Sequence, residues 1–230
     1  MATYLEVVNK VLVRLNEVPV TQDNFAQARG IHKTVIDVVS DVVNRINAMY
    51  PRWPWLAREV SVTLTPGVST YNWPQDFVEA DWYSFFGQGS QTWNLNPKAI
   101  RNADRNAWYP YERERIASNS TLRARPEYVF DGPGMNFQIG PIPDRAYIIS
   151  YRYYAKAPRL SSWGDLILIP DQYDYIIVEG ALAHLKTFKA DIETAQVTKA
   201  DFTQMINELI RIYAPNPDTV RTGFIHRRRY

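Results

Sequence analysis

The chain contains no cysteine among its 230 residues. Disulfide bonds and thiolate metal sites both require cysteine, so this protein has neither. A cysteine-free chain suits synthesis in a reducing cytoplasm, which is where we expect it to be made. Histidine is also scarce, because only His32, His184 and His226 occur, and they fall in three different predicted elements. We therefore predict no metal site and no cofactor.

Long apolar runs are missing as well. A helix that spans a bilayer needs about 20 consecutive apolar residues, and the apolar runs of this chain are much shorter. Residues 1–6 also lack the basic segment and the apolar core of a signal peptide. We expect no membrane-spanning segment and no signal peptide.

The familiar catalytic motifs are absent. The chain has no Gly-x-Ser-x-Gly, no Gly-x-x-x-x-Gly-Lys and no His-Glu-x-x-His. A general base needs a second group to orient it, so we interpret His184 as a core or interface residue. Residues 131–134 form a Gly-rich turn, but a strand follows it, so it offers no helix N-terminus to a phosphate. We predict that the protein is not an enzyme and has no catalytic residues.

Aromatic residues, in contrast, are abundant. They make up 13% of the chain, with 15 tyrosines and 7 tryptophans. Tyrosine and tryptophan are enriched at protein interfaces because each combines a large apolar body with a polar tip. A tyrosine-rich β region would give the same composition, and both interpretations remain open.

Apolar periodicity predicts two pairs of helices, one at each end of the chain. The first pair covers residues 3–17, with a capping box formed by Thr3 and Glu6, and residues 23–49, with Asp23 as the N-cap. In the second pair, one helix is opened by Pro170 and the other spans about residues 193–213. Two such pairs can bury their apolar faces against each other, which predicts a four-helix bundle.

The middle of the chain has the pattern of β structure. Alternating residues around 60–64 and 68–71 flank a Pro-Gly turn and predict a β-hairpin. The runs 128–130, 137–139 and 146–154 are separated by turns and predict a β-meander. Residues 87–97 are rich in Gly, Ser, Gln and Asn and predict an exposed loop.

The expected fold class is therefore α+β. We predict a four-helix bundle, built from the N- and C-terminal helix pairs, with an inserted antiparallel β subdomain and an extended C-terminal arm. The expected divisions are residues 1–52 plus 169–213 for the helical bundle, 53–168 for the β-rich insert, and 214–230 for the arm. Pro215 and Pro217 end the last helix and keep the arm extended.

Positive charge is concentrated in this arm. The formal net charge is +2, and the last ten residues contain four arginines and no acid, so the rest of the chain sums to −2. Arginine pairs with carboxylates and phosphates, and aromatic and aliphatic residues lie between the arginines. A basic terminus without a role and a nucleic-acid-binding segment are the alternatives, although no basic stripe accompanies it. We favour an arm that docks into a groove of a partner protein.

Four stretches of the sequence resemble the head-to-tail adaptor proteins of short-tailed bacteriophages, including tail tubular protein A types. They are Thr-Tyr-Leu-Glu-Val-Val-Asn at 3–9, Tyr-Asn-Trp-Pro-Gln-Asp-Phe-Val-Glu-Ala-Asp-Trp at 71–82, the region 128–154, and Ile-Pro-Asp-Gln-Tyr at 169–173 leading to Glu-Gly-Ala-Leu-Ala at 179–183. Their order and number carry the resemblance, because none of them is a catalytic signature.

The resemblance implies a virion structural protein at the head-tail interface. It implies a closed cyclic homo-oligomer of about twelve copies with heterologous contacts. This ring would bind the portal protein, extend the channel for the encapsidated DNA and provide the platform for the tail nozzle protein. We expect DNA to pass without specific binding, and the free chain to be largely monomeric, with its arm unordered until assembly.

We infer two sets of contact residues on this basis. The portal-binding set lies in the arm and comprises Arg221, Phe224, Ile225, Arg227, Arg228, Arg229 and Tyr230. The set that would contact the nozzle or a neighbouring subunit lies in the predicted loop and comprises Gln88, Gln91, Trp93 and Asn94. The alternative function is a carbohydrate- or receptor-binding tail component, suggested by three tryptophans expected to be exposed, Trp82, Trp93 and Trp108.

Overall fold

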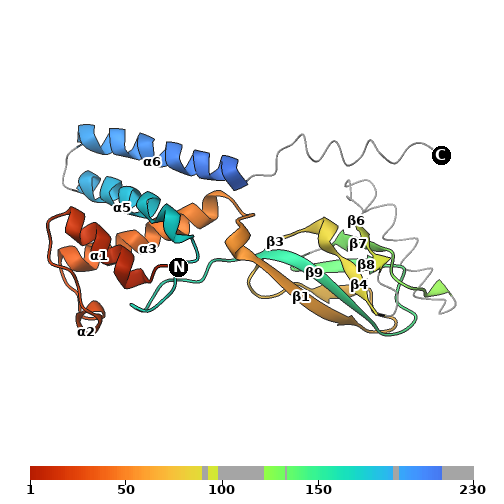
Figure 1. The fold of residues 1–230 in the computed structure, drawn as a ribbon. Helices are drawn as coiled ribbons and strands as arrows, with labels where there is room; N and C mark the ends of the chain where they lie inside the picture. The colour runs from red at the N-terminus through yellow and green to blue at the C-terminus, as the bar shows by residue number, and fades with distance from the viewer. Residues whose placement is uncertain (90–92, 98–121, 133, 189–191, 214–230) are drawn as a thin grey trace. The chain divides into compact units, whose positions relative to one another are not determined.

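The computed structural model describes residues 1–89, 93–97, 122–132, 134–188 and 192–213 (Figure 1). The chain is of the expected α+β class, with helices and mainly antiparallel sheets. It forms two compact units. The helical unit contains Met1–Leu56 and the chain from Ala157 onwards, and the β unit contains Ala57–Lys156.

The first helix, α1 (Tyr4–Arg14), has the predicted capping box. The Glu6 N–H donates to Thr3 Oγ1 at 3.3 Å, and the Thr3 N–H donates to Glu6 Oε2 at 2.8 Å. These two bonds satisfy N–H groups that have no partner within the helix. They also hold the pKa of the Glu6 carboxyl below its ordinary value, chiefly through the bond from the Thr3 backbone. The helix therefore begins where the sequence predicts.

The single helix predicted over residues 23–49 is wrong. The structure has a short α2 (Gln22–Phe25), whose N-cap is Thr21 rather than Asp23, and a separate α3 (Ile31–Met49). Gly30 separates them with φ 58° and ψ −132°, a conformation that only glycine adopts readily. The apolar spacing continues across this break, so periodicity alone does not reveal it.

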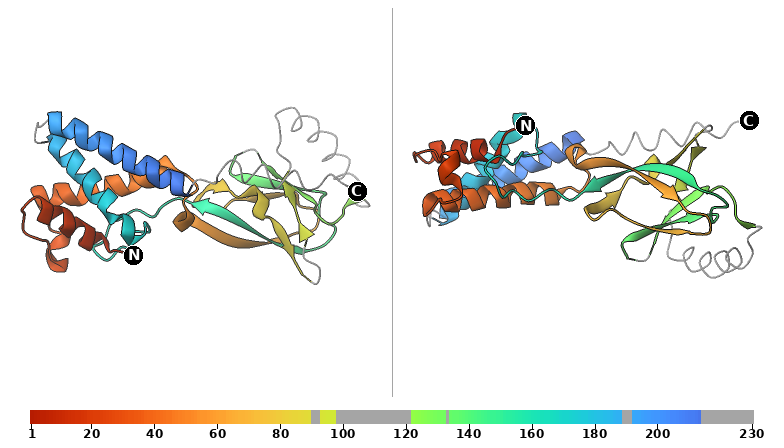
Figure 2. Two further views of the ribbon diagram at one scale, coloured as in Figure 1. Left: turned by 45° about the horizontal axis from the view of Figure 1, so that its top comes forward. Right: turned by 90° about the horizontal axis from the view of Figure 1, so that it is seen from below.

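The second pair of helices begins with η4 (Asp171–Tyr173), which continues into α5 (Asp174–Phe188), and ends with α6 (Ile192–Tyr213). In Figures 1 and 2, α5 lies between α6 and α3, and α5 also contacts α1. Gly180 allows a close approach of α5 and α6, because a Cβ there would lie 2.5 Å from the Phe202 ring. The four helices pack in layers around α5, and closure into a four-helix bundle stays a prediction.

The core of the helical unit includes residues that lie outside these four helices. Trp53 is fully buried and donates from Nε1 to the Ile46 carbonyl at 3.0 Å. Leu56, in η1 (Pro54–Leu56), is buried in the same cluster. Ile167 and Ile169, in the segment before η4, are also buried there. The segments that flank the β unit are thus part of the helical core.

The β unit contains two sheets. The first has the order β1-β9-β4-β5, with β3 also paired to β9, and the second has the order β2-β8-β7-β6. The strands of the first are β1 (Ala57–Leu64), β3 (Phe77–Ala80), β4 (Phe86–Gln88), β5 (Trp93–Asn94) and β9 (Tyr147–Ala155). Those of the second are β2 (Thr70–Asn72), β6 (Asn96–Pro97), β7 (Tyr128–Asp131) and β8 (Asn136–Gly140).

The predicted β-hairpin around the Pro-Gly turn is wrong. β1 pairs with β9 and β2 pairs with β8, so the chain changes sheets at this turn. The predicted meander is correct only for its first two strands, because β7 and β8 pair in antiparallel orientation whereas β9 joins the other sheet. The residues of the turns indicate where strands end. They do not indicate which strands pair, because pairing depends on which strand faces are buried against each other.

One aromatic core joins the two sheets. Trp73, Phe85, Phe137 and Tyr151 are buried in a single cluster, with ring centroids 4.6–6.3 Å apart. Such offset and edge-on pairs add to the free energy of burial. Burial also raises the pKa of the Tyr151 hydroxyl far above its ordinary value. In this unit, therefore, several tyrosines and tryptophans serve the core.

Candidate interaction surfaces

The predicted loop 87–97 forms a β-hairpin at the edge of the first sheet where the structure describes it. Gln88 ends β4 and Asn94 ends β5, and both side chains are exposed. Gln88 donates from Nε2 to Ser150 Oγ at 2.5 Å, and Ser150 Oγ lies 2.7 Å from Ser61 Oγ. These bonds link β4, β9 and β1 on one face of the sheet. Gln91 lies outside the described residues.

Trp93 packs within the β unit. Its Nε1 donates to the Pro126 carbonyl at 3.0 Å, and its ring lies edge-on to Tyr147 with centroids 5.5 Å apart. The guanidinium of Arg125 lies over the ring at 5.3 Å, a cation–π contact. Gly87 on β4 leaves room for this ring, because a Cβ there would lie 2.2 Å from it. Trp93 therefore supports the hairpin that carries Gln88 and Asn94.

Trp82, another tryptophan expected to be exposed, is half-buried. It lies in η2 (Trp82–Ser84), where its ring stacks on Phe85 at 5.9 Å and meets Trp73 edge-on at 5.8 Å. Trp82 and Trp93 are thus both partly buried, and each has ring contacts within the β unit. Trp108 lies outside the described residues.

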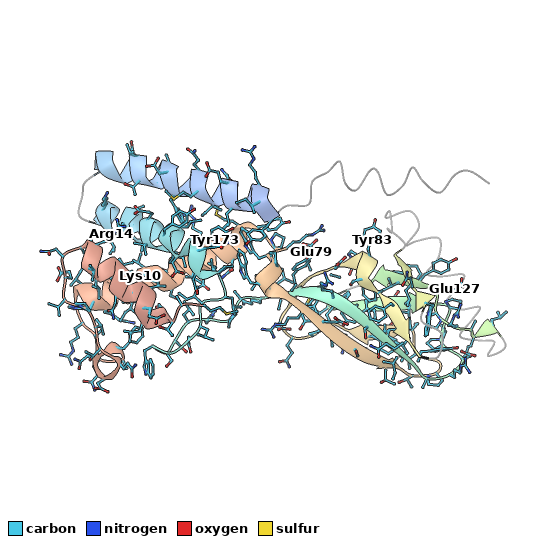
Figure 3. All side chains as sticks on the ribbon, viewed as in Figure 1. Lys10, Arg14, Glu79, Tyr83, Glu127 and Tyr173 are labelled. Atoms are coloured by element: carbon cyan, nitrogen blue, oxygen red, sulfur yellow. The ribbon has the colours of Figure 1, made fainter. Side chains whose placement is uncertain are left out.

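The exposed aromatic side chain beside Trp82 is Tyr83, labelled in Figure 3. It is 77% exposed, and Asp81, two positions before it, caps the turn by accepting from the Tyr83 N–H at 3.4 Å. Val78 on β3, in the same unit, is 49% exposed. Exposed tyrosine is enriched at contact surfaces with other proteins. The sequence pattern pointed to Trp82 rather than Tyr83. The two residues are adjacent and both aromatic, so only the structure shows which side chain is exposed.

A second surface lies in the helical unit, in a groove of about 650 Å³ between α1 and α5. Lys10 and Arg14, labelled in Figure 3, extend from α1, where Lys10 Nζ lies 2.7 Å from Asp174 Oδ2 and Arg14 lies 3.7 Å from Glu179. Two exposed apolar side chains, Val13 and Tyr175, also belong to it. One residue in the sequence could have indicated this groove. Val13 is apolar but lies outside the stripe of α1 that is buried.

His184, on α5, is half-buried. Burial lowers the pKa of its imidazole, and Arg45 and Lys199 lower it further, while Asp41 acts in the opposite direction. These groups come from α3 and α6, which both pack on α5. His184 thus lies at a junction of three helices.

The described residues contain neither a candidate metal site nor a candidate membrane-spanning helix. No group of three or more His, Asp or Glu side chains has the arrangement of a metal site. Within the same part of the chain, no helix combines the length and the apolar character that crossing a membrane requires. The predicted portal-binding residues, Arg221 to Tyr230, all lie outside the described residues.

The surfaces described above are suited to contacts with other proteins. A comparison with curated proteins found no match. A comparison with protein families found that residues 2–222, nearly the whole chain, match the family described as SU10 adaptor protein. This match confirms the resemblance inferred from four stretches of the sequence. The chain therefore belongs to the SU10 adaptor protein family, and it is a phage structural adaptor.

Proposed function

We propose that this protein forms the ring that connects the phage head to its tail. The observation that carries the proposal is the family match over residues 2–222, which includes both compact units. An adaptor must bind one partner on the head side and another on the tail side. A chain with a helical unit and a separate β unit has distinct surfaces for these two tasks. About twelve copies would close into a cyclic ring with heterologous contacts.

The partner on the head side is the portal protein, and the C-terminal arm docks on it. Arg221, Arg227, Arg228 and Arg229 pair with carboxylates of the portal, because guanidinium groups form paired hydrogen bonds with them. Phe224, Ile225 and Tyr230 act as apolar anchors. The composition of residues 221–230 supports this assignment, since it combines four arginines with these three anchors and has no acid.

The partner on the tail side is the nozzle protein. The hairpin of β4 and β5 supports a contact there, because Gln88 and Asn94 are exposed while Trp93 holds the hairpin in place. Tyr83 adds an exposed aromatic side chain in the same unit. Exposed polar groups beside an aromatic side chain are suited to binding a neighbouring subunit or the nozzle.

The ring would surround the DNA as it leaves the capsid. Apart from residues 221–230, the chain sums to −2. A slightly acidic wall repels the phosphate backbone weakly, so DNA slides along it without adhering. The protein therefore needs neither a cofactor nor catalytic residues for this role.

Native mass spectrometry of the chain mixed with the portal ring of its own phage tests the proposal. The expected result is about twelve copies per portal ring. The matched variant replaces Arg227, Arg228 and Arg229 by Glu in the full-length chain, and binding should then be lost. If the unaltered chain ignores the portal but binds a glycan array, the carbohydrate-binding alternative replaces this proposal.

A further inference from the structure

β1 is a long and regular edge strand. All eight of its residues, from Ala57 to Leu64, pair with β9, and the register from Ala57↔Tyr154 to Leu64↔Tyr147 continues without a shift. Among the described residues, no other strand pairs with β1. In such a strand, every second residue directs its N–H and C=O away from the sheet. The outer side of β1 is therefore a row of unpaired backbone groups.

The other strands at the sheet margins, so far as the structure describes them, are much shorter. β5 and β6 have two residues each and β2 has three. β3 has four residues and an irregular register opposite β9. Short strands and irregular registers are how proteins prevent pairing at sheet edges. β1 has neither of these protections.

The composition of β1 also favours pairing. It contains no proline and no glycine, and its only charged residues, Arg58 and Glu59, stand near its beginning. Arg58 forms an ion pair with Asp76 at 3.0 Å, and Glu59 lies opposite Arg152 on β9. Residues 60–64 alternate between Val or Leu and Ser or Thr. A long edge of this kind is a template for strand addition.

We propose that the outer edge of β1 accepts an added strand from the C-terminal segment of a second copy, residues 219–225. This inference rests on the proposed ring and identifies one contact that closes it. A ring needs heterologous contacts, in which two different surfaces meet. Pairing of β1 with the β1 of another copy would give a two-fold dimer instead. The chain must therefore supply a different segment as the donor.

Residues 219–225 have the composition of a strand. Thr219, Val220, Thr222, Phe224 and Ile225 are β-branched or aromatic, the residue types that strands prefer. The segment follows Tyr213, the last described residue of α6. Residues 219–225 begin six positions and end twelve positions beyond Tyr213, so an extended chain carries them about 20–40 Å from the end of α6. Pro215 and Pro217 favour that extension over a return to the same chain.

Strand addition and portal docking divide the arm between them. The added strand binds through its backbone, and its side chains project on both faces of the sheet. If residues 219–225 pair with a neighbour, then Arg221, Phe224 and Ile225 belong to that contact, and the portal contact falls to Arg227, Arg228, Arg229 and Tyr230. A seven-residue contact gives little affinity by itself, because association has a high entropic cost. A weak contact of this kind forms only where the portal raises the local concentration of the copies, as expected for a free chain that is largely monomeric.

Site-specific cross-linking tests the contact, and the absence of native cysteine makes it selective. One chain carries Thr63→Cys on β1, where the side chain is exposed, and a second carries Thr222→Cys. The two chains are mixed, assembled on the portal ring and treated with a short bis-maleimide. Each chain has one thiol, so a product between the two variants can form only between copies. We expect this heterodimer to be the main product. Val220→Cys replaces Thr222→Cys in a second experiment, which tests a pairing register shifted by two residues.

Two proline variants provide an independent test. Consecutive residues of a strand direct their N–H groups to opposite sides. One of Val62→Pro and Thr63→Pro therefore removes a bond to β9, and the other removes a free N–H on the outer edge. The variant that keeps the melting temperature of the unaltered chain is the informative one. It should lose the cross-link and form incomplete rings while single copies still bind the portal.

The outcomes separate the inference from the proposed function. Complete rings without the heterodimer, and with no effect of the stable proline variant, overturn strand addition and leave the adaptor ring in place. A homodimer of the Thr63→Cys chain would mean that β1 pairs with itself. A cross-link within a chain that carries both cysteines, in dilute monomer, would mean that the arm covers its own β1. Failure to bind the portal would overturn both proposals.

Discussion

Tyr213 lies edge-on against Trp55, with ring centroids 5.5 Å apart. Trp55 in turn stacks on Trp53 at 4.5 Å, and Trp53 is fully buried. The last residue of α6 is thus held against the segment that precedes the first strand. The end of α6 is therefore fixed to the helical unit by an aromatic anchor.

Replacing Tyr213 by alanine should loosen this anchor. The variant loses the ring contacts to Trp53, Trp55 and Tyr173, and we expect the free energy of unfolding to fall by about 2 kcal/mol. Denaturation with urea measures this. Tyr213→Phe is the control, because it keeps the ring and loses only the 3.4 Å bond between the hydroxyls of Tyr213 and Tyr173. Equal losses in both variants would contradict a role for the ring.

Gly180→Ala tests the close approach of α5 and α6. Alanine favours a helix by about 1 kcal/mol over glycine, but its Cβ would lie 2.5 Å from the Phe202 ring. Overpacking costs about 1–3 kcal/mol, so we expect a net loss of stability. Gly164→Ala is the matched control, since a Cβ there meets no atom within 4 Å. A stabilised Gly180→Ala variant would mean that Phe202 moves aside without cost.

Stability should depend on pH through His184. Its pKa in the folded chain lies below the ordinary value of about 6.5, chiefly because of burial. The unfolded chain therefore binds more protons, so this stability is fully present above the ordinary pKa of about 6.5 and is lost as the pH falls below it through the lower pKa of the folded state. We expect the melting temperature to decrease over this range.

His184→Gln should reduce that pH dependence, because glutamine does not titrate. Asp41, Arg45 and Lys199, the charged groups that act on the pKa of His184, are unchanged in this variant. His32→Gln is the control, because His32 lies at the start of α3, where its Nε2 lies 2.9 Å from the Val18 carbonyl oxygen. A variant that keeps the full pH dependence would assign it to another group.

Trp93→Ala should destabilise the β unit by about 2–4 kcal/mol. The variant loses the bond to Pro126, the contact with Tyr147 and the cation–π contact with Arg125. Hydrogen exchange of the strands measures the loss within this unit. Asn94→Ala, which removes an exposed side chain of the same strand, should leave exchange unchanged. If neither variant alters exchange but both weaken assembly, Trp93 acts in binding rather than in folding.

The helices were largely predictable, because an amphipathic stripe reports which face is buried. The capping box of Thr3 and Glu6 was found from two residues, since it depends only on local hydrogen bonds. The break at Gly30 was missed, because the apolar spacing continues through it. The burial of Trp53 and Ile167 was also beyond periodicity, since both lie in segments without a repeating pattern.

The strands were found from their residues, but their partners were not. The segment of β1 was recognised by its alternation, yet it pairs with β9, about ninety positions further along the chain. Such long-range pairing depends on how two sheets share a core, and no local signal reports it. The same limit applies to the candidate surfaces: composition identified the tryptophans, but only packing shows that Tyr83 is exposed and Trp93 is not.

The β unit begins and ends on the same pair of strands, because Ala57, its first residue, lies opposite Tyr154 near its end. An insertion whose entry and exit are hydrogen-bonded neighbours can be lengthened, replaced or exchanged between relatives without disturbing its host. The β unit can therefore vary in length and sequence within this family while the helical core, which includes Leu56 just before it, keeps its packing.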